Sequence, residues 1–387
     1  MLQRVYLDNF KSLVDFSLPP KSDPLDLPSF SCLVGLNGSG KSTILQAFDF
    51  LSQLPQGDID DWLKVRGWKA KDLTSRFTKR STISFEVTLS VQGKRIVWSG
   101  AYNAVLQRCT AEEIVSDGVR VMMVRDGTLQ IHGSPDPAVS VKELIYQGSI
   151  LSIYKFDEEK SPAVKAIRDF SKGLKSLELL NPQLMKNRSR SADDVGFGGE
   201  KLTAFYHGLD AEKKSVISDT LRTFYPQVKQ ILSSSLKAGL KTLAVVESFE
   251  RGSTSRLETE TIHLNDGMLR ILTIITQMQS GHSCLLFDEI ENGINAELVE
   301  QLMDYLVAGE KQVIVTTHSP MVLNYLDDDV AKNGVFLIYR TTRGYTRCGR
   351  FFNSTQAKEK LLLLGPGEVL IDTSLDEVAQ ELESALP

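Results

Sequence analysis

Apolar and polar side chains alternate in two segments of the chain. They do so over residues 1–9 and, more regularly, over residues 82–91. This period of two is that of a strand with one buried face. Turn-forming pairs that end in glycine separate several further short runs, as in hairpins. The pattern predicts an antiparallel meander over about residues 82–133, within a β lobe that spans residues 82–150.

The remaining chain shows helical and mixed patterns. Residues 158–235 have mainly helical spacing and predict a helical insertion over residues 155–255. After about residue 262, a helix, a very apolar strand, a helix and a second strand follow, which is typical of an α/β fold. We therefore expect residues 1–60 and 260–345 to form an α/β core, followed by a C-terminal tail over 346–387 with an amphipathic helix near its end. No heptad pattern is long enough for an extended coiled coil.

The most informative motif is the run GLNGSGKS from Gly35 to Ser42, which fits G-x-x-x-x-G-K-[ST] in full. It lies between an apolar strand-like run and a segment with helical spacing, as a phosphate-binding loop requires. We expect Lys41 to reach the β- and γ-phosphates and Ser42 to ligate Mg²⁺. An accidental glycine-rich turn is the alternative. The loop residues expected to bind the nucleotide are Asn37, Gly38, Ser39, Gly40, Lys41, Ser42 and Thr43.

Acidic and basic groups follow two apolar runs far downstream. One run, from residue 283, ends in Asp288 and Glu289, and the next ends in His318. Asp288 is placed to hold Mg²⁺, and Glu289 to orient or deprotonate the attacking water. His318 is placed to contact the γ-phosphate, although a lone histidine at a strand end is more often structural. A strand that ends in acids is by itself a weak signal.

A third segment, residues 264–270, reads LNDGMLR and opens an apolar helix. Asn265 or Asp266 is a suitable N-cap residue. The simplest interpretation is a capped helix of the core. The functional interpretation is a helix N-terminus that is offered to a phosphate.

Composition argues against a strongly basic, a cysteine-rich or a membrane-spanning protein. The chain has 387 residues and a net charge of −5, so no global basic field indicates a nucleic-acid binder. Its four cysteines lack metal-binding spacing, and we expect buried, reduced thiols. No apolar run approaches the roughly 20 residues of a membrane span, and the first residues read as a strand rather than a secretory leader. These features predict a cytoplasmic protein without membrane contact.

The order of the motifs resembles that of ABC-type ATPases, in the RecF- and SMC-like branch rather than the transporters. Two details strengthen the resemblance. Residues 9–12 read NFKS, similar to the NF[KR]S opening of that branch, and residues 291–295 read ENGIN, similar to the ENGLHP segment of prokaryotic RecF-like and OLD-like ATPases. The resemblance implies an α/β ABC-ATPase head that forms a single domain over residues 1–387. It also implies Mg²⁺-dependent ATP hydrolysis.

The resemblance implies further site residues. Lys11 would approach the phosphates. The segment Asn265, Asp266 and Gly267 would match the signature that caps the γ-phosphate bound by a second copy, so that two protomers enclose two ATP molecules. The family usually has serine where this chain has Asn265. A glutamine that ligates Mg²⁺ is expected after the meander, with Gln147 as the candidate and Gln107 as its rival. His318 would be the switch histidine.

The sequence leaves two alternatives for the partner of such an ATPase. About 50 residues follow Tyr339, too few for an appended nuclease domain, so a nuclease-like effector is expected on a separate chain, as in antiphage defence. The alternative is a DNA-clamping or repair ATPase, because residues 64–80 are rich in lysine and arginine with aromatic residues between them, and residues 186–190 form a second basic cluster. The packed edge of a lobe is the simpler interpretation of the first cluster.

Overall fold

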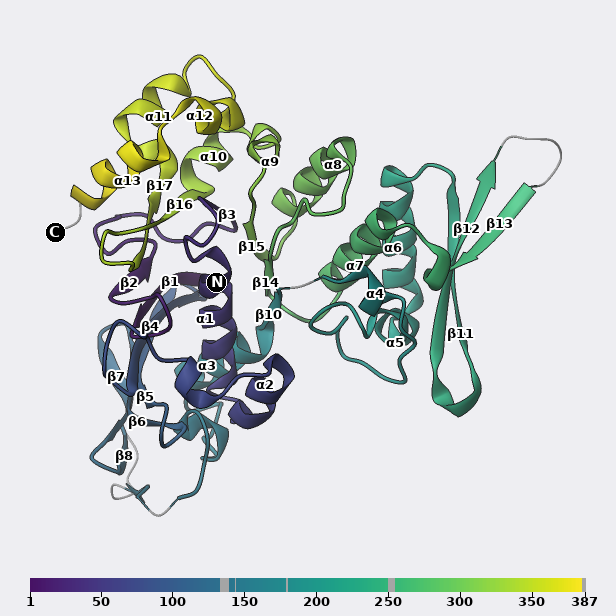
Figure 1. Cartoon of the computed structure of the whole chain (residues 1–387). Helices are drawn as coiled ribbons and strands as arrows, with labels where there is room; N and C mark the ends of the chain where they lie inside the picture. Colours follow the sequence, from purple (N-terminus) through teal and green to yellow (C-terminus); the bar gives the residue numbers. More distant parts are fainter. Residues whose placement is uncertain (133–138, 143, 179, 250–254, 385–387) are drawn as a thin grey trace. The chain divides into compact units, whose positions relative to one another are not determined.

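The computed structural model describes residues 1–132, 139–142, 144–178, 180–249 and 255–384 (Figure 1). The chain forms two compact units. Unit 1 comprises Met1–Ser176, Ser283–Leu286 and Gln312–Pro387, and unit 2 comprises Leu177–His282 and Phe287–Lys311. The phosphate loop belongs to unit 1, and the paired acids and the start of α7 belong to unit 2.

A six-stranded sheet forms the α/β core. Its order is β10 (Leu174–Leu177), β14 (Cys284–Phe287), β15 (Gln312–Thr316), β3 (Phe30–Val34), β16 (Val335–Arg340) and β17 (Thr346–Arg350). Strands β15 and β16 both run parallel to β3, and β17 pairs antiparallel with β16. Every residue of β3, β14 and β15 is buried, as expected for parallel strands that are covered on both faces. The sheet contains strands at the positions expected for β3, β14, β15 and β16. It departs from the expected bounds, because β10 and β17 lie outside residues 1–60 and 260–345, and the strands over residues 2–8 and 16–18 join an antiparallel sheet instead.

An eight-stranded antiparallel sheet forms the β lobe of unit 1 (Figure 1). Its order is β2 (Phe16–Leu18), β1 (Leu2–Asp8), β4 (Thr82–Val91), β5 (Lys94–Asn103), β6 (Arg108–Ser116), β7 (Val119–Arg125), β8 (Thr128–Ile131) and β9 (Val139–Ser140). From β4 to β9 each strand pairs with the next one along the chain. This is the predicted meander, although positions 133–138 lie outside the described residues.

The helices of unit 1 surround these sheets: α1 (Lys41–Gln53), α2 (Ile59–Arg66), α3 (Pro162–Gly173), α9 (Pro320–Asn324), α10 (Asp328–Gly334), α11 (Thr355–Lys360), α12 (Pro366–Asp372) and α13 (Leu375–Ser384). Phe50 of α1 is fully buried and stacks on Phe10, with 5.4 Å between ring centroids. It also meets Tyr102 of β5 edge-on at 5.1 Å. Burying such side chains contributes about 1.5–3 kcal/mol each. This packing fixes the helix that follows the phosphate loop.

Unit 2 contains α4 (Pro182–Met185), α5 (Leu202–Gly208), α6 (Ala211–Phe224), α7 (Asp266–Met278) and α8 (Ala296–Val307), with an antiparallel sheet of β11 (Val228–Ser235), β12 (Lys241–Phe249) and β13 (Ser255–Glu260). The expected helices extend to Phe224. From Val228 onward the chain forms strands instead. The longest described helix, α6, has 14 residues, so the described residues hold no extended coiled coil.

Single 3-10 turns connect some of these elements: Ala70–Asp72, Ile150–Ser152, Lys237–Gly239, Thr261–His263 and Phe351–Asn353. All four cysteines are buried and form no disulfide, as expected. Among the described residues, no helix combines the length and the apolar character needed to cross a membrane.

Candidate active site

The phosphate loop of unit 1 needs glycine at two positions where other strands approach it. Gly35 and Gly40 have φ angles of 145° and 113°. A Cβ atom on Gly35 would lie 2.1 Å from the carbonyl oxygen of Ile338 in β16, and one on Gly40 would lie 2.4 Å from Oγ1 of Thr346 in β17. Both distances are too short for any side chain. The close approach therefore explains why the loop carries glycine at these positions.

Thr346 braces the loop. Its hydroxyl donates a hydrogen bond to the carbonyl oxygen of Ser39 at 2.9 Å, and its Oγ1 lies 2.8 Å from Oγ of Ser12. Because the single hydroxyl proton of Thr346 goes to Ser39, Ser12 is the donor in the second bond. The serine of the NFKS motif therefore supports the phosphate loop through β17. No motif marks Thr346, which lies 307 residues after Ser39.

Lys41 occupies a nearly closed position at the start of α1. Its residue is 4% exposed, and Nζ donates to the carbonyl oxygens of Gly35 at 2.7 Å and Leu36 at 3.2 Å. Nζ also lies 3.3 Å from Nδ1 of His318, which follows β15. Because an ammonium group only donates, Nδ1 of His318 is the acceptor in this contact. The structure thus brings Lys41 and His318 together.

Lys11 lies beside α1. Its Nζ donates to Oε1 of Gln46 at 2.7 Å and lies 3.3 Å from the centroid of the Trp68 ring. The ring face attracts the ammonium group, so Trp68 supports Lys11 in this position. The sequence analysis missed Gln46, because no motif marks it, and placed Trp68 among aromatic residues of a possible DNA surface. The contact of Lys11 with a nucleotide stays a prediction.

The two glutamines considered as metal ligands bind the same carboxylate. Gln147 donates from Nε2 to Oδ2 of Asp60 at 2.6 Å and accepts from the backbone N–H of Asp60 at 3.1 Å. Gln107 donates to Oδ1 of Asp60 at 2.9 Å. The arrangement does not discriminate between the two glutamines, and the assignment of Gln147 stays a prediction.

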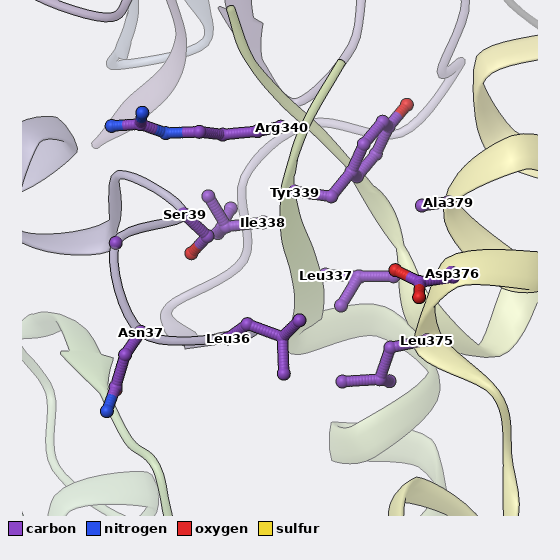
Figure 2. A pocket seen from close by; sticks show the side chains of 11 residues that line it. Leu36, Asn37, Ser39, Leu337, Ile338, Tyr339, Arg340, Leu375, Asp376 and Ala379 are labelled. Atoms are coloured by element: carbon purple, nitrogen blue, oxygen red, sulfur yellow. The ribbon is translucent and has the colours of Figure 1, made fainter. Parts of the chain in front are cut away.

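A cavity of about 190 Å³ lies beside the phosphate loop in unit 1 (Figure 2). Figure 2 shows the side chains of Leu36, Leu337 and Leu375 near one another, with Asp376 of α13 beside Leu337 and above Leu375. Pockets that bind drug-sized ligands have volumes of about 300–1,000 Å³. This cavity is too small for a nucleotide, and we do not assign ATP to it.

The paired acids belong to unit 2, directly after the buried strand β14. Asp288 is half-buried, and its backbone N–H donates to the carbonyl oxygen of Leu177 at 3.3 Å. Glu289 is exposed and has a φ angle of 48°, a left-handed conformation that is strained for a residue with a side chain. Its Oε2 accepts a hydrogen bond from Nδ2 of Asn292 at 3.1 Å. The turn that contains Asn292 therefore fixes the carboxylate that was predicted to act on water.

The signature-like segment forms the start of α7, also in unit 2. Oδ1 of Asn265 accepts from the backbone N–H of Met268 at 2.8 Å, so Asn265 is the N-cap residue. The amide nitrogen of its side chain is not used in this cap. Asp266 pairs with Lys186 at 3.1 Å. A Cβ on Gly267 would lie 3.1 Å from the carbonyl oxygen of Gly293, so this glycine allows the segment around residue 293 to approach the helix.

Two protein-family models match parts of the chain that contain the candidate site residues. A family model described as "AAA ATPase domain" matches residues 1–92, which include the phosphate loop. A second, described as "AAA domain, putative AbiEii toxin, Type IV TA system", matches residues 166–324, which include the signature-like segment, the paired acids and His318. No curated protein matches the chain.

Two solved structures resemble the whole chain. One is an SMC head domain with an extended coiled coil bound to the C-terminal domain of ScpA, derived from Pyrococcus furiosus, with a TM-score of 0.54 and 12% identity over 93% of this chain and 98% of that one. The other is an SMC head bound to the C-winged helix domain of ScpA, with a TM-score of 0.51 and 14% identity over 90% and 96%. The chain has the SMC-type head fold. The two family models independently indicate an AAA-type ATPase.

Proposed function

We propose that the chain binds ATP with Mg²⁺ and hydrolyses it. The observation that carries this proposal is the buried ammonium group of Lys41, held by two loop carbonyls and His318 at the N-terminus of α1. Oγ of Ser39 in the same loop is buried and has no hydrogen-bond partner among the described residues. Buried hydroxyl groups normally have a partner, and a phosphate oxygen would supply one here. The loop therefore fits a polyphosphate.

The residues proposed to hold Mg²⁺ offer oxygen atoms only. They are the hydroxyl of Ser42, the carboxylate of Asp288 and the side-chain amide of Gln147, and hard oxygen ligands are those that Mg²⁺ prefers. The bound ion would neutralise charge on the phosphates. In this proposal Lys41 adds a second positive charge at the γ-phosphate, and Glu289 takes the proton of the attacking water.

We further propose that two copies enclose ATP and that the closed dimer controls a separate, nuclease-like effector in antiphage defence. Asn265 supports the first step, because its unused amide donor and the N-terminus of α7 suit a phosphate bound by the other copy. Both SMC heads named above were solved with a partner protein, ScpA. The family description that names a toxin system also favours a regulatory role.

The test is a tagged Glu289→Gln variant, purified from its own host in Mg-ATP and analysed by native mass spectrometry. We expect slow turnover, with a kcat lowered by at least about 100-fold, and a dimer that carries an unrelated protein at fixed stoichiometry. Lys41→Ala is the control, since it should lose nucleotide affinity and the dimer. Turnover of Glu289→Gln at the wild-type rate would refute the general-base assignment. A dimer without a second protein would refute the effector.

The second candidate function is direct DNA clamping, favoured by the basic residues Lys69, Lys71, Arg76 and Lys79 of the linker. It predicts ATP-dependent DNA binding that weakens with salt, as counterion release requires. Fluorescence anisotropy with duplex DNA, at low and physiological salt, tests it. Charge reversal at Lys69, Lys71 and Lys79 should then abolish binding, and unchanged affinity would exclude this function.

A further inference from the structure

Arg270 occupies a confined place on α7, one helical turn after Asp266. Its side chain lies over Gly293, where a Cβ would be 3.1 Å from Nε and 3.5 Å from Cδ of the arginine. Gly293 has a φ angle of 70°, and its carbonyl oxygen meets Gly267 at the start of the same helix. The turn that follows Glu289 is therefore packed against α7 at two points. All of these residues belong to unit 2.

The charges around Arg270 are unusual for a packing residue. Burial lowers the pKa of its guanidinium group, and the nearby carboxylates of Asp266 and Glu289 raise it in opposition. Its Nε is buried and has no hydrogen-bond partner among the described residues. Burying a charged group with incomplete partners costs free energy, so an apolar side chain would serve better if the position only needed filling. The charge at this position therefore suggests a function.

Lys186 is a second cation beside Asp266. Its ammonium group pairs with Oδ1 of Asp266 at 3.1 Å, and its side chain is only 19% exposed. Asp266 thus has its own cation. Glu289 is held on its other side by Asn292, at Oε2. Along this part of unit 2 the charges alternate, from Lys186 through Asp266 and Arg270 to Glu289.

We infer that Arg270 is a positioning residue that orients the Glu289 carboxylate and connects it to the signature-like segment of the same protomer. The inference rests on the proposed function, in which Glu289 accepts a proton from water. In the proposed dimer, the signature-like segment and Glu289 of one protomer serve different ATP molecules. Binding of a phosphate at the first turn of α7 would then influence, through Arg270, the position of Glu289, the general base that acts on the other ATP.

Two measurements on Arg270→Ala and Arg270→Lys test the inference. In steady-state hydrolysis we expect Arg270→Ala to lower kcat by roughly 10- to 100-fold, because misplaced catalytic groups cost this much, with little change in the affinity for a fluorescent ATP analogue. Arg270→Lys should recover part of the loss. Millimolar guanidinium should restore Arg270→Ala, whereas sodium chloride at equal ionic strength should not. Arg188→Ala, which removes an exposed ion pair with Glu260 in the same unit, is the matched control and should leave kcat unchanged.

Hydrogen–deuterium exchange of the peptide over residues 287–296 is the second measurement, and it does not depend on turnover. We expect faster exchange in Arg270→Ala, confined to this peptide, and no change in Arg188→Ala. Unchanged exchange would overturn the inference even in a protein that hydrolyses no ATP. If the wild type hydrolyses ATP and Arg270→Ala matches its kcat, the inference fails while the proposed function stands. A wild type without turnover refutes the proposed function alone.

Discussion

Replacing Thr346 with valine tests whether β17 holds the phosphate loop in place. Valine has nearly the same shape as threonine, so the change removes one hydroxyl group from a fully buried position. That hydroxyl donates to the carbonyl of Ser39 and accepts from Ser12. The methyl groups still fit against Gly40. The variant therefore isolates two hydrogen bonds from the packing of the loop.

The expected cost follows from these two bonds. A buried group that loses its only partner costs about 1–3 kcal/mol, and a typical hydrogen bond contributes about 0.5–1.5 kcal/mol net. Because Ser12 can rotate its hydroxyl to another acceptor, we expect a total loss of about 2 kcal/mol in the free energy of unfolding. In a large domain this lowers the melting temperature by about 4–8 °C. In Thr346→Val the phosphate loop is held less firmly and must be ordered when ATP binds. This cost should raise the KM for ATP by up to about 10-fold, with kcat unchanged.

Differential scanning fluorimetry and steady-state ATPase assays measure both effects. Thr88→Val is the matched control, because Thr88 is 1% exposed in the same unit and its hydroxyl has no hydrogen-bond partner among the described residues. Removing that hydroxyl should be neutral or slightly stabilising. If Thr346→Val and Thr88→Val melt at the same temperature and both keep the wild-type KM, the proposed brace of the loop is wrong.

Two further predictions concern the β lobe and the glutamines. Burial raises the pKa of the Asp8 carboxyl, but hydrogen bonds from Arg80 outweigh it, and the pKa lies below its usual value. The ionised Asp8 carboxylate therefore stabilises the fold fully above the usual carboxyl pKa, and this stabilisation is lost as pH falls below about 4. Asp8→Asn should unfold at lower urea concentration at pH 7 and lose less stability on acidification than the exposed control Asp126→Asn; parallel pH profiles would contradict this. Gln147→Ala should lower Mg²⁺-dependent kcat by about 10-fold, whereas Gln107→Ala, which loses a bond to the same carboxylate, should not; equal effects in both variants would refute the assignment of Gln147.

The parts of the fold that the sequence predicted correctly depend on short-range patterns. The alternation in residues 82–91 and the apolar run before Gly35 describe strands that are evident from their own residues. The phosphate loop was recognised from its own consecutive residues, although the strands β16 and β17 that require glycine at Gly35 and Gly40 lie far along the chain. By contrast, Thr346 and Gln46 act through space on Ser39 and Lys11, and nothing in their own neighbourhood in the sequence marks them. Such residues become visible only when the fold brings distant segments together.

The segment after Phe224 shows where local patterns mislead. It was expected to be helical, but residues 228–249 form two strands of an antiparallel sheet. The run of serines at 233–235 is a poor helix former, and the β-branched residues Val245 and Val246 favour strands. The third strand, β13, pairs with β12 and leads directly to the turn before α7. This small sheet therefore positions the signature-like segment, and no sequence motif predicted that role.

The ion pairs of the two basic clusters bear on the choice between a protein partner and DNA. In the linker, the buried Arg66 pairs with Asp49, Lys64 pairs with Asp61, and Arg80 forms two hydrogen bonds with Asp8. In the second cluster, Lys186 pairs with Asp266 and Arg188 with Glu260. A phosphate backbone would have to compete with these carboxylates for the five cations in the pairs, whereas Lys69, Lys71, Arg76 and Lys79 of the linker take no part in these pairs. The Lys186–Asp266 pair lies at the start of α7, and the Arg80–Asp8 pair lies at the end of β1 in the β lobe, so Lys186 and Arg80 contribute to local packing. These pairs therefore reduce the number of basic residues in the two clusters that a phosphate backbone could contact without first breaking an ion pair.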